Sequence, residues 1–438
     1  MVGPIQHERG TMRDSEILAN AKRASQPTAT AIDRQQDSPD GFPIRQKTSW
    51  KLLFLVTEDW YFWSHRLSIA RAARAAGAEV LVMSHITRYR EAMEAEGFNV
   101  IDWHVSRGSW NPLREVRPFL EVVRIYRREL PTLVHHVALK PIIHGGVAAR
   151  LSGGISSVNA IAGLGHIFIA STWKNQLLCR VLSVFMRWAL NTANAKTVFQ
   201  NRENCELLVG EGIVPHDRTI IIRGVGVNTR TFCPQPEPAG PPVVMLPSRM
   251  LWEKGVGEFV SAARSLREQG LAARFVLVGG PDPHNPASIP KTQLQAWVES
   301  GVVEWWGHRN DMGAIFAQSS LVCLPSYLEG LPKVLVEAAA CGRAIVTTDV
   351  PGCRDVVRHG ENGFLVPPRD GKALASTLAL LLNNKTLRAT MGARGREIVV
   401  RDFSEECLNE QILAVYRELL TIRSGALLLQ VPEPGSPV

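Results

Sequence analysis

The feature that most constrains the fold is a repeated alternation of short apolar runs with helix-like segments. Apolar runs typical of buried strands stand at 51–56, 79–83 and 132–135, and helix-like segments stand at 64–76 and 140–151. Parallel strands need a crossover connection, which is usually a helix, so this alternation is typical of a parallel, doubly wound sheet.

A proline-rich stretch separates this series from a second one. Residues 234–242 read Pro-Gln-Pro-Glu-Pro-Ala-Gly-Pro-Pro. Such a stretch cannot join a helix or a central strand, and it acts as a semi-rigid spacer. The strands predicted beyond it are 243–246, 274–278, 302–306, 321–324, 344–347 and 363–366.

The length of 438 residues also favours two domains over one. We predict an α/β protein with two Rossmann-like, doubly wound domains that face each other across a cleft. The predicted division is a disordered extension at 1–48, a first domain at 49–233, the linker at 234–242, a second domain at 243–423 whose helix at about 401–420 crosses back to the first domain, and a disordered tail at 424–438.

The net charge of +8 is unevenly distributed. Residues 1–240 contain 29 Lys or Arg against 21 Asp or Glu, whereas the remainder contains 20 of each. A basic first half suggests an anionic partner, either nucleic acid or a membrane face. The absence of a dense Lys/Arg run argues against nucleic acid, although a mildly basic chain need not have an anionic partner at all.

The seven cysteines are scattered and form no C-x-x-C pair, which fits a reducing compartment without disulfides or structural metal. The polar N-terminus does not read as a signal peptide. An uncharged stretch at 155–172 is interrupted by polar and small residues, so we do not expect it to span a membrane. We expect a cytosolic protein that can sit on a membrane surface.

Two glutamates carry most of the functional information. Glu329 follows the predicted strand 321–324, and Glu337 lies about one turn into the helix-like run that begins at Lys333. Ligands of open α/β sheets bind beyond the carboxyl ends of the strands. Two carboxylates at that edge can grip the hydroxyl groups of one polar ligand.

Three further strand-to-helix loops could bind the rest of such a ligand. Arg249 and Lys254 follow the strand at 243–246, where two cations and a helix N-terminus suit a diphosphate, although both could instead be solvated cations. Gly279 follows the strand at 274–278 and would allow close approach of a ligand or of another backbone. Gly307 and Arg309, in what could equally be an ordinary loop, could read and cover a nucleobase.

These motifs, in this order, resemble those of the retaining nucleotide-sugar glycosyltransferases of family 4, which have the GT-B fold. The resemblance covers about residues 50–420 and includes the Gly360-Glu-Asn-Gly363 segment. It implies that Arg249 and Lys254 bind the diphosphate, that Glu337 binds the ribose and that Glu329 binds the transferred sugar. It also implies that the amides of Gly330 and Leu331 support the sugar and phosphates, and that no metal or other cofactor is required.

The first half resembles a subgroup that acts on polyprenyl-diphosphate-linked sugars in bacterial glycan assembly. The residues that carry this resemblance include the aromatic run Trp60–Trp63, His135 and Lys140. We interpret the aromatic run as a loop that packs under a ligand or fills the core. The acceptor candidates are Trp60, His65, His135 and Lys140, where His135 could instead be a structural histidine. Asn159 stands where many members have a histidine, and it is a candidate contact for the donor sugar.

The combined prediction is a retaining glycosyltransferase. It would move a hexose or N-acetylhexosamine from a UDP-sugar to a polyprenyl-diphosphate-linked saccharide, at the inner face of the bacterial cytoplasmic membrane. Its partners would be the nucleotide sugar, the lipid-linked saccharide and an anionic membrane surface, but not nucleic acid. Three alternatives stay open, namely a soluble glucan- or sucrose-type synthase, a UDP-sugar epimerase and a non-catalytic glycan-binding protein.

Overall fold

The structure is a computed structural model that describes residues 50–106, 111–161, 173–224, 226–283 and 285–428. All of these described residues belong to one compact unit. The extension predicted at 1–48 lies outside the described residues.

Seven parallel strands form the first sheet, in the order β3-β2-β1-β4-β5-β6-β7. Strand β1 lies between β2 and β4, so the sheet is built outward in both directions from this point, as in doubly wound folds. The strands are β1 (Trp50–Glu58), β2 (Ala78–His85), β3 (Asn99–Asp102), β4 (Leu133–Val137), β5 (Ser156–Ile161), β6 (Ala195–Phe199) and β7 (Thr219–Ile221).

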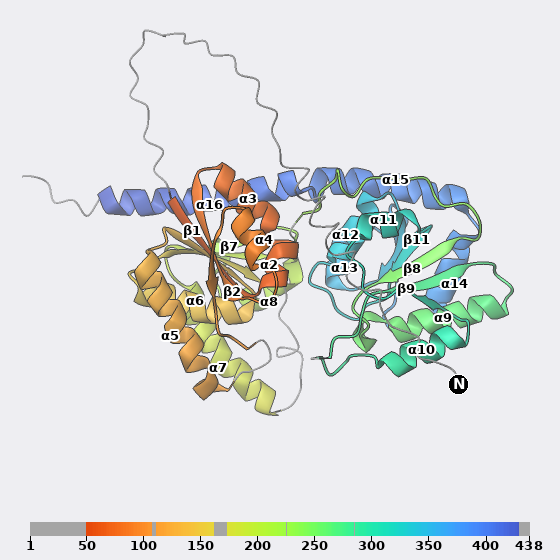
Figure 1. Cartoon of the computed structure of the whole chain (residues 1–438), viewed down its shortest axis with the longest axis horizontal. Coiled ribbons are helices and arrows are strands. Elements are labelled where there is room, and N and C mark those ends of the chain that lie inside the picture. Colours follow the sequence, from red (N-terminus) through yellow and green to blue (C-terminus); the bar gives the residue numbers. More distant parts are fainter. Residues whose placement is uncertain (1–49, 107–110, 162–172, 225, 284, 429–438) are drawn as a thin grey trace, which may run out of the picture. The chain divides into compact units, whose positions relative to one another are not determined.

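Helices cover both faces of this sheet (Figure 1). One face packs against α5 (Pro112–Glu129), α6 (Leu139–Leu151) and α7 (Trp173–Leu190). The other face packs against α2 (Asp59–His65), α3 (Leu67–Ala75) and the C-terminal α16 (Glu405–Leu428). The remaining helices of this part are α4 (Arg90–Ala95), α8 (Arg202–Gly210) and the 3₁₀ turn η2 (His216–Arg218).

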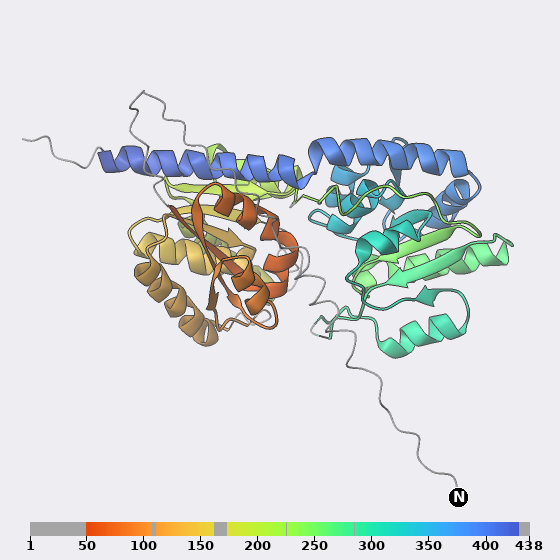
Figure 2. The ribbon, with the colours of Figure 1, turned by 45° about the horizontal axis from the view of Figure 1, so that its top comes forward.

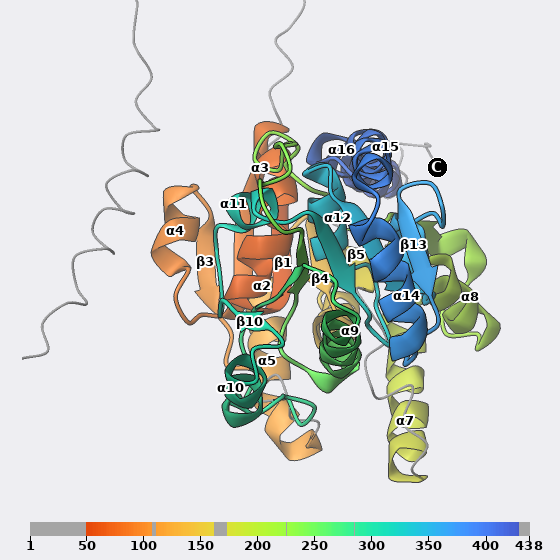
Figure 3. The same cartoon turned by 90° about the vertical axis from the view of Figure 1, so that its right-hand side faces the viewer.

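Six parallel strands form the second sheet, in the order β10-β9-β8-β11-β12-β13. One face packs against α9, α10 and α14, of which α9 and α14 lie side by side (Figure 3). The other face packs against α11, α12, α13 and α15. The strands are β8 (Val243–Pro247), β9 (Arg274–Val278), β10 (Glu304–Trp305), β11 (Leu321–Leu324), β12 (Ala344–Thr348) and β13 (Gly363–Val366). The helices are α9 (Val256–Glu268), α10 (Lys291–Glu299), α11 (Met312–Ala317), α12 (Lys333–Ala340), α13 (Pro351–Val356), α14 (Gly371–Leu382) and α15 (Lys385–Asp402), with the 3₁₀ turn η3 (Trp252–Lys254).

The predicted α/β class with two doubly wound parallel sheets is confirmed. All six strands predicted after the linker exist, although the strand predicted at 302–306 is reduced to Glu304–Trp305. Continuous apolar runs mark these strands because both faces of a parallel sheet are covered by helices. The exact boundaries of the domains stay predictions.

The interpretation of the aromatic run Trp60–Trp63 as a loop was wrong. These residues lie in α2, which begins at Asp59. The buried carboxylate of Asp59 accepts hydrogen bonds from the backbone N–H of Trp60 and from those of Thr87, Arg88 and Tyr89. It therefore fixes the start of α2 and the loop after β2 together, and these hydrogen bonds hold the pKa of the carboxyl below its usual value despite burial.

The last helix, predicted at about 401–420, is present as α16, which begins at Glu405. Residues 401 and 402 belong instead to α15, which ends at Asp402. Helix α15 packs against α12 of the second sheet, and α16 packs against α3 of the first (Figure 2). Helix α16 runs through Leu428, into the tail that was predicted to be disordered, and residues 429–438 lie outside the described part.

The uncharged stretch at 155–172 begins as the buried strand β5, and its remainder lies outside the described residues. Among the helices that the structure describes, none combines the length and the apolar character needed to cross a bilayer.

Two glycines of α15 provide a test of its packing. A Cβ atom at Gly392 would lie 2.0 Å from the carbonyl oxygen of Gly342, whereas one at Gly395 would meet its nearest neighbour at 3.4 Å. We expect Gly392→Ala to lower the free energy of unfolding by about 1–3 kcal/mol, because the packed backbone must move. The matched Gly395→Ala should be neutral or stabilising by up to about 1 kcal/mol, since alanine favours helix. Urea unfolding measures both, and equal effects would contradict this packing.

Candidate active site

The central contact of the site joins Lys254 and Glu329. The Lys254 Nζ atom lies 2.6 Å from Glu329 Oε1, and both side chains are largely buried. Lys254 ends η3 in the loop after β8, and Glu329 lies in the loop after β11. Strands β8 and β11 are neighbours in the sheet, so their carboxyl ends bring together two residues that are 75 positions apart.

Backbone contacts hold these two loops against each other. The N–H of Tyr327 donates to the carbonyl oxygen of Glu253 (2.9 Å), and the hydroxyl of Ser326 donates to the same oxygen (3.2 Å). Gly255 has a φ of 71°, and a Cβ atom there would lie 2.0 Å from the carbonyl oxygen of Pro325. Glycine is therefore required at this position by both conformation and space.

Arg249 forms the second cation–carboxylate pair of the site. Its NH1 atom lies 2.7 Å from Oδ2 of Asp282, which belongs to the loop after β9. Asp282 was not among the predicted site residues. Its position two residues after Gly280 is the signal that could have been used, because loops after neighbouring strands meet at one edge of a sheet.

Glu337 lies in the first turns of α12, beside Lys333. The Lys333 Nζ atom lies 3.5 Å from Oε1 of Glu337, and the Glu337 side chain is largely buried. Burial raises the pKa of the Glu337 carboxyl, and the Lys333 ammonium offsets part of that effect. Lys333 also donates to the carbonyl oxygen of Ser64 in α2 (2.7 Å), and it was not among the predicted site residues.

His65 is a neutral imidazole at the end of α2. Burial, then the nearby Lys333 and Arg66 cations, lower its pKa to about 3. Its ring stacks on Tyr61 with centroids 4.2 Å apart, and its Nδ1 atom lies 2.6 Å from the Ser64 hydroxyl. Trp60 packs edge-on against Tyr61. A neutral imidazole here can accept or donate a hydrogen bond but does not add positive charge.

Gly279 and Gly307 have structural roles at the end of β9. A Cβ atom at Gly279 would lie 1.8 Å from the carbonyl oxygen of Ser248, so its close approach is to another backbone. The Gly279 N–H donates to the carbonyl oxygen of Gly307 (2.7 Å). Arg309 is exposed and pairs with Asp311 through two contacts of 2.6 and 2.8 Å.

A cavity of about 910 Å³ brings most of the predicted residues together. Its volume lies in the usual range for small-molecule sites. The predicted residues that line it are Trp60, His65, Arg249, Lys254, Gly279, Arg309, Glu329, Gly330, Leu331 and Glu337. Lining residues that were not predicted include Tyr61, Gln200, Asp282, His308, Met312 and Lys333.

Four predicted residues do not line this cavity: Gly307, which lies just after β10, and three residues that are buried elsewhere. Asn159 is fully buried in β5, where its Oδ1 atom lies 2.7 Å from Nδ1 of His136. The Nδ1 atom of His135 contacts the hydroxyl of Tyr416 from α16. Lys140 forms an ion pair with Glu115 (2.8 Å) in the first-sheet core. The roles predicted for these residues remain untested.

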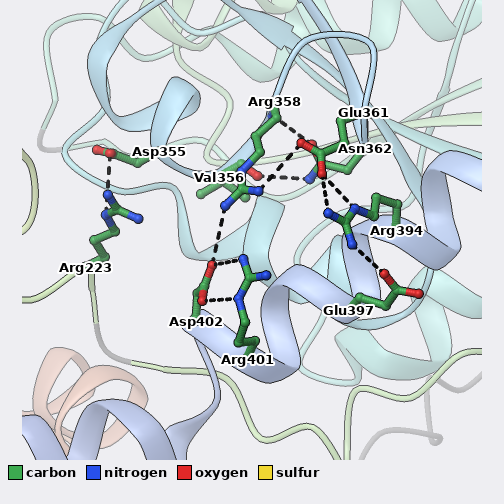
Figure 4. A network of polar contacts seen from close by, with 10 residues as sticks. All are labelled: Arg223, Asp355, Val356, Arg358, Glu361, Asn362, Arg394, Glu397, Arg401 and Asp402. Carbon is green, nitrogen blue, oxygen red and sulfur yellow. Dashed lines mark hydrogen bonds and ion pairs between the residues drawn. The ribbon is translucent and has the colours of Figure 1, made fainter.

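The Gly360–Gly363 segment has a visible structural role (Figure 4). The fully buried Asn362 accepts a hydrogen bond from the N–H of Arg358 (2.7 Å) and donates one to the carbonyl oxygen of Val356 (3.0 Å). Glu361 pairs with Arg394 of α15 at 2.6 Å. These contacts fix the turn that precedes β13 and tie it to α15.

Within the described parts of the chain, no group of three or more His, Cys, Asp or Glu side chains is positioned to hold a metal ion. Whether the reaction needs a metal or another cofactor therefore stays a prediction.

The protonation of His65 can be measured directly. We expect histidine NMR to place its pKa at about 3 in the folded protein, and near 6.5 in the urea-unfolded chain. Lys333→Met should raise the folded value, because one repelling cation is removed, while burial keeps it below 6.5. Comparison with His65→Gln assigns the resonance. A folded pKa near 6.5 would contradict this environment.

Known proteins resemble both halves of the chain. Residues 51–201 match the family described as glycosyl transferase 4-like, and residues 241–384 match glycosyl transferases group 1. An N,N'-diacetylbacillosaminyl-diphospho-undecaprenol alpha-1,3-N-acetylgalactosaminyltransferase from Campylobacter jejuni is 26% identical over 81% of this chain and 95% of its own length. The putative glycosyltransferase EpsD of Bacillus subtilis is 25% identical over 84% of this chain and 96% of its own length.

Solved structures share the fold. A sucrose-phosphate synthase from Thermosynechococcus elongatus aligns with a TM-score of 0.70 and 20% identity, over 85% of this chain and 100% of that one. Anabaena HepE in complex with UDP aligns with a TM-score of 0.68 and 20% identity, over 84% and 100%. Together with the site geometry, these matches show that the chain belongs to the family 4 glycosyltransferases of the GT-B fold.

Proposed function

We propose that this glycosyltransferase moves a hexose or N-acetylhexosamine from a UDP-sugar to a polyprenyl-diphosphate-linked saccharide, with retention of configuration, in the assembly of a bacterial surface glycan. The observation that carries the proposal is the pairing of Lys254 with Glu329 in a cavity that Arg249 and Glu337 also line. The cavity therefore combines cations, which can bind a diphosphate, with carboxylates, which can bind the hydroxyl groups of a sugar and a ribose.

The cations of this cavity suit a diphosphate. Lys254 and Arg249 come from one loop, and each is neutralised by a carboxylate in the described structure. On donor binding, the diphosphate takes the place of a carboxylate as the partner of these cations. It gains negative charge as the sugar departs, so interactions with preoriented cations strengthen toward the transition state.

The carboxylates suit hydroxyl groups. Glu329 is released from Lys254 by the diphosphate and accepts hydrogen bonds from the hydroxyls of the transferred sugar. Glu337, one helix turn away from the loop, accepts from the ribose hydroxyls. Charge-assisted hydrogen bonds of this kind are about twice as strong as neutral ones.

The reaction needs no oxidant or reductant. The acceptor hydroxyl oxygen forms a bond to the anomeric carbon, while the bond from that carbon to the diphosphate oxygen breaks on the same face. The hydroxyl proton passes to the departing phosphate oxygen, and UDP leaves. His65 is neutral and lies in the same cavity, so it can hydrogen-bond the acceptor without competing with the diphosphate.

The acceptor assignment is supported by the Campylobacter jejuni relative, whose name specifies a diphospho-undecaprenol sugar and whose length is 95% covered. The capsular polysaccharide biosynthesis glycosyltransferase CapM of Staphylococcus aureus and the "putative colanic acid biosynthesis glycosyltransferase WcaL" of Escherichia coli match shorter regions, 40% and 47% of this chain. The proposed place of action is the inner face of the cytoplasmic membrane, where such an acceptor and a soluble nucleotide sugar meet.

The proposal is tested by incubating the purified protein with a panel of UDP-, GDP- and TDP-sugars and undecaprenyl-diphosphate-linked mono- and disaccharides. Mass spectrometry of the lipid fraction should show one added hexose or N-acetylhexosamine from a UDP-sugar. NMR of the product should show an unchanged anomeric configuration. Epimerised donor without a lipid product would contradict the proposal, as would equal transfer to free sugars.

Variants separate binding from transfer. Glu329→Ala should abolish transfer but leave UDP binding intact, because it frees Lys254 for the diphosphate. Lys254→Met should weaken UDP binding by about ten- to a hundredfold, since a charge-assisted hydrogen bond contributes roughly 1.5–3 kcal/mol. Arg264→Gln, an exposed change on α9, is the matched control for lost charge. Calorimetry with UDP measures binding, and full transfer by Glu329→Ala would overturn the assigned roles.

A further inference from the structure

Helix α5 exposes an apolar stripe that its own core does not use. Its inward face buries Pro118, Val122 and Tyr126. Its outward face carries Leu113, Val116 and Leu120, which are 86%, 51% and 57% exposed. Residues spaced three and four apart lie on one side of a helix, so these three form a continuous stripe.

Helix α7 exposes a second apolar stripe with the same spacing. Val181, Val184, Phe185 and Trp188 are between 37% and 61% exposed, whereas Leu182 and Met186 on its other side are buried. Single exposed apolar residues are common, but two stripes of three and four such residues, on helices that cover the same sheet face, are typical of an interaction site.

The helices that present the stripes are basic. Helices α5, α6 and α7 together carry ten Lys or Arg and only three Glu. Helix α7 carries no acidic residue. The three glutamates are already engaged, because Glu115 pairs with Lys140, Glu121 with Arg117 and Glu129 with Arg128. Arg114, Arg124 and Arg180 are exposed beside the stripes.

The α5 stripe lies close to the carboxyl edge of the first sheet, whereas the α7 stripe lies in the C-terminal half of its helix, farther from that edge. Helices that connect parallel strands run antiparallel to them, so the N-terminal ends of α5 and α7 lie at the carboxyl edge of the first sheet. Helix α6 contacts both α5 and α7, which places all three on one face (Figure 1). The Leu113 end of the stripe is therefore at the edge where ligands of such sheets bind.

We propose that the outward faces of α5 and α7 form a docking surface for an anionic phospholipid membrane. The two stripes insert at the level of the lipid headgroups, and the surrounding arginines contact lipid phosphates. The role of this surface rests on the proposed function: it would hold the carboxyl edge of the first sheet near a lipid-linked acceptor. The arginines complement the lipid phosphates of an anionic bilayer, and the neighbouring aliphatic and aromatic side chains complement its apolar interior.

Charge favours lipid over a second copy of the chain. A self-complementary dimer through this surface would bring the same basic face of each copy together. That contact would place like charges against each other with the local glutamates already paired. An anionic lipid surface satisfies the apolar stripes and the arginines at once.

Co-sedimentation of the full-length protein with vesicles tests the surface. The vesicles are pure phosphatidylcholine or an equal mixture with phosphatidylglycerol, and neither contains a polyprenyl lipid, so binding to the acceptor does not contribute. The protein should bind the anionic vesicles, and binding should weaken as salt is raised. Absence of binding, or equal binding to both vesicles, overturns the proposal.

Matched variants locate the binding. Replacing Leu113, Val116 and Leu120 with serine should weaken binding to anionic vesicles by about tenfold or more, because each loses inserted apolar area. The control replaces Val298, Leu380 and Val400, which are 39–50% exposed on helices of the second sheet, and should bind as the parent does. Equal loss in both variants, or loss in neither, overturns the location.

The charges are tested in the same way. Arg114→Gln, Arg124→Gln and Arg180→Gln together should weaken binding and flatten its salt dependence, whereas Arg264→Gln, Lys291→Gln and Lys385→Gln should not. Sedimentation velocity checks the other occupant. The proposal is overturned in favour of self-association if the parent protein forms a dimer, the serine variant does not, and neither binds vesicles.

Failure of this surface is distinguishable from failure of the proposed function. With a water-soluble, short-chain prenyl-diphosphate saccharide, the serine variant should transfer sugar at the parent rate. With the undecaprenyl acceptor in anionic vesicles, its rate should fall. If neither protein transfers sugar to any acceptor, the proposed function fails, while vesicle binding still decides the surface. Equal transfer rates for the parent and the serine variant on the vesicle-bound acceptor would contradict the proposed role of this surface.

Discussion

The candidate active site depends on the close contact between the loops that follow β8 and β11. These strands are neighbours at the point where the second sheet changes its direction of growth. The loops touch because Gly255 lets the backbone approach Pro325, and the carbonyl oxygen of Glu253 accepts from Ser326 and Tyr327. This backbone geometry brings Lys254 and Glu329 into contact, so the two loops that carry them are positioned before any substrate binds.

The second consequence of this arrangement is electrostatic. Lys254 and Arg249 are each paired with a carboxylate, and Glu337 is paired with Lys333. Partly buried charges are costly unless they are paired, so the pairs keep the cavity stable without a ligand. The proposed donor brings its own negative charge to the cations and its own hydroxyls to the carboxylates. On binding, each cation exchanges a carboxylate for a phosphate, and each carboxylate exchanges a cation for hydroxyl groups, so every charged group keeps a partner.

Much of the second half was predictable from sequence, because its signals are local. Each strand is a short apolar run that ends in glycine or a polar loop, and the residues at those ends could be read directly. Glu329, Glu337, Arg249 and Lys254 were found in this way, and they line one cavity. The parallel order of the strands then follows from the helices between them.

The remainder depends on contacts between distant residues. Asp282 was missed because its pairing with Arg249 spans 33 positions. The aromatic run was misread because Asp59 fixes the start of α2 through the distant loop at 87–89, which no local pattern reveals. The start of the last helix was placed at 401 rather than at Glu405, because the break between α15 and α16 depends on their packing against different sheets.

A crystal structure with UDP bound tests the exchange of partners most directly. We expect the diphosphate to contact the Lys254 ammonium and the Arg249 guanidinium, the ribose hydroxyls to donate to Glu337, and Glu329 no longer to contact Lys254. A diphosphate bound elsewhere, or one that leaves the Lys254–Glu329 contact intact, would contradict it.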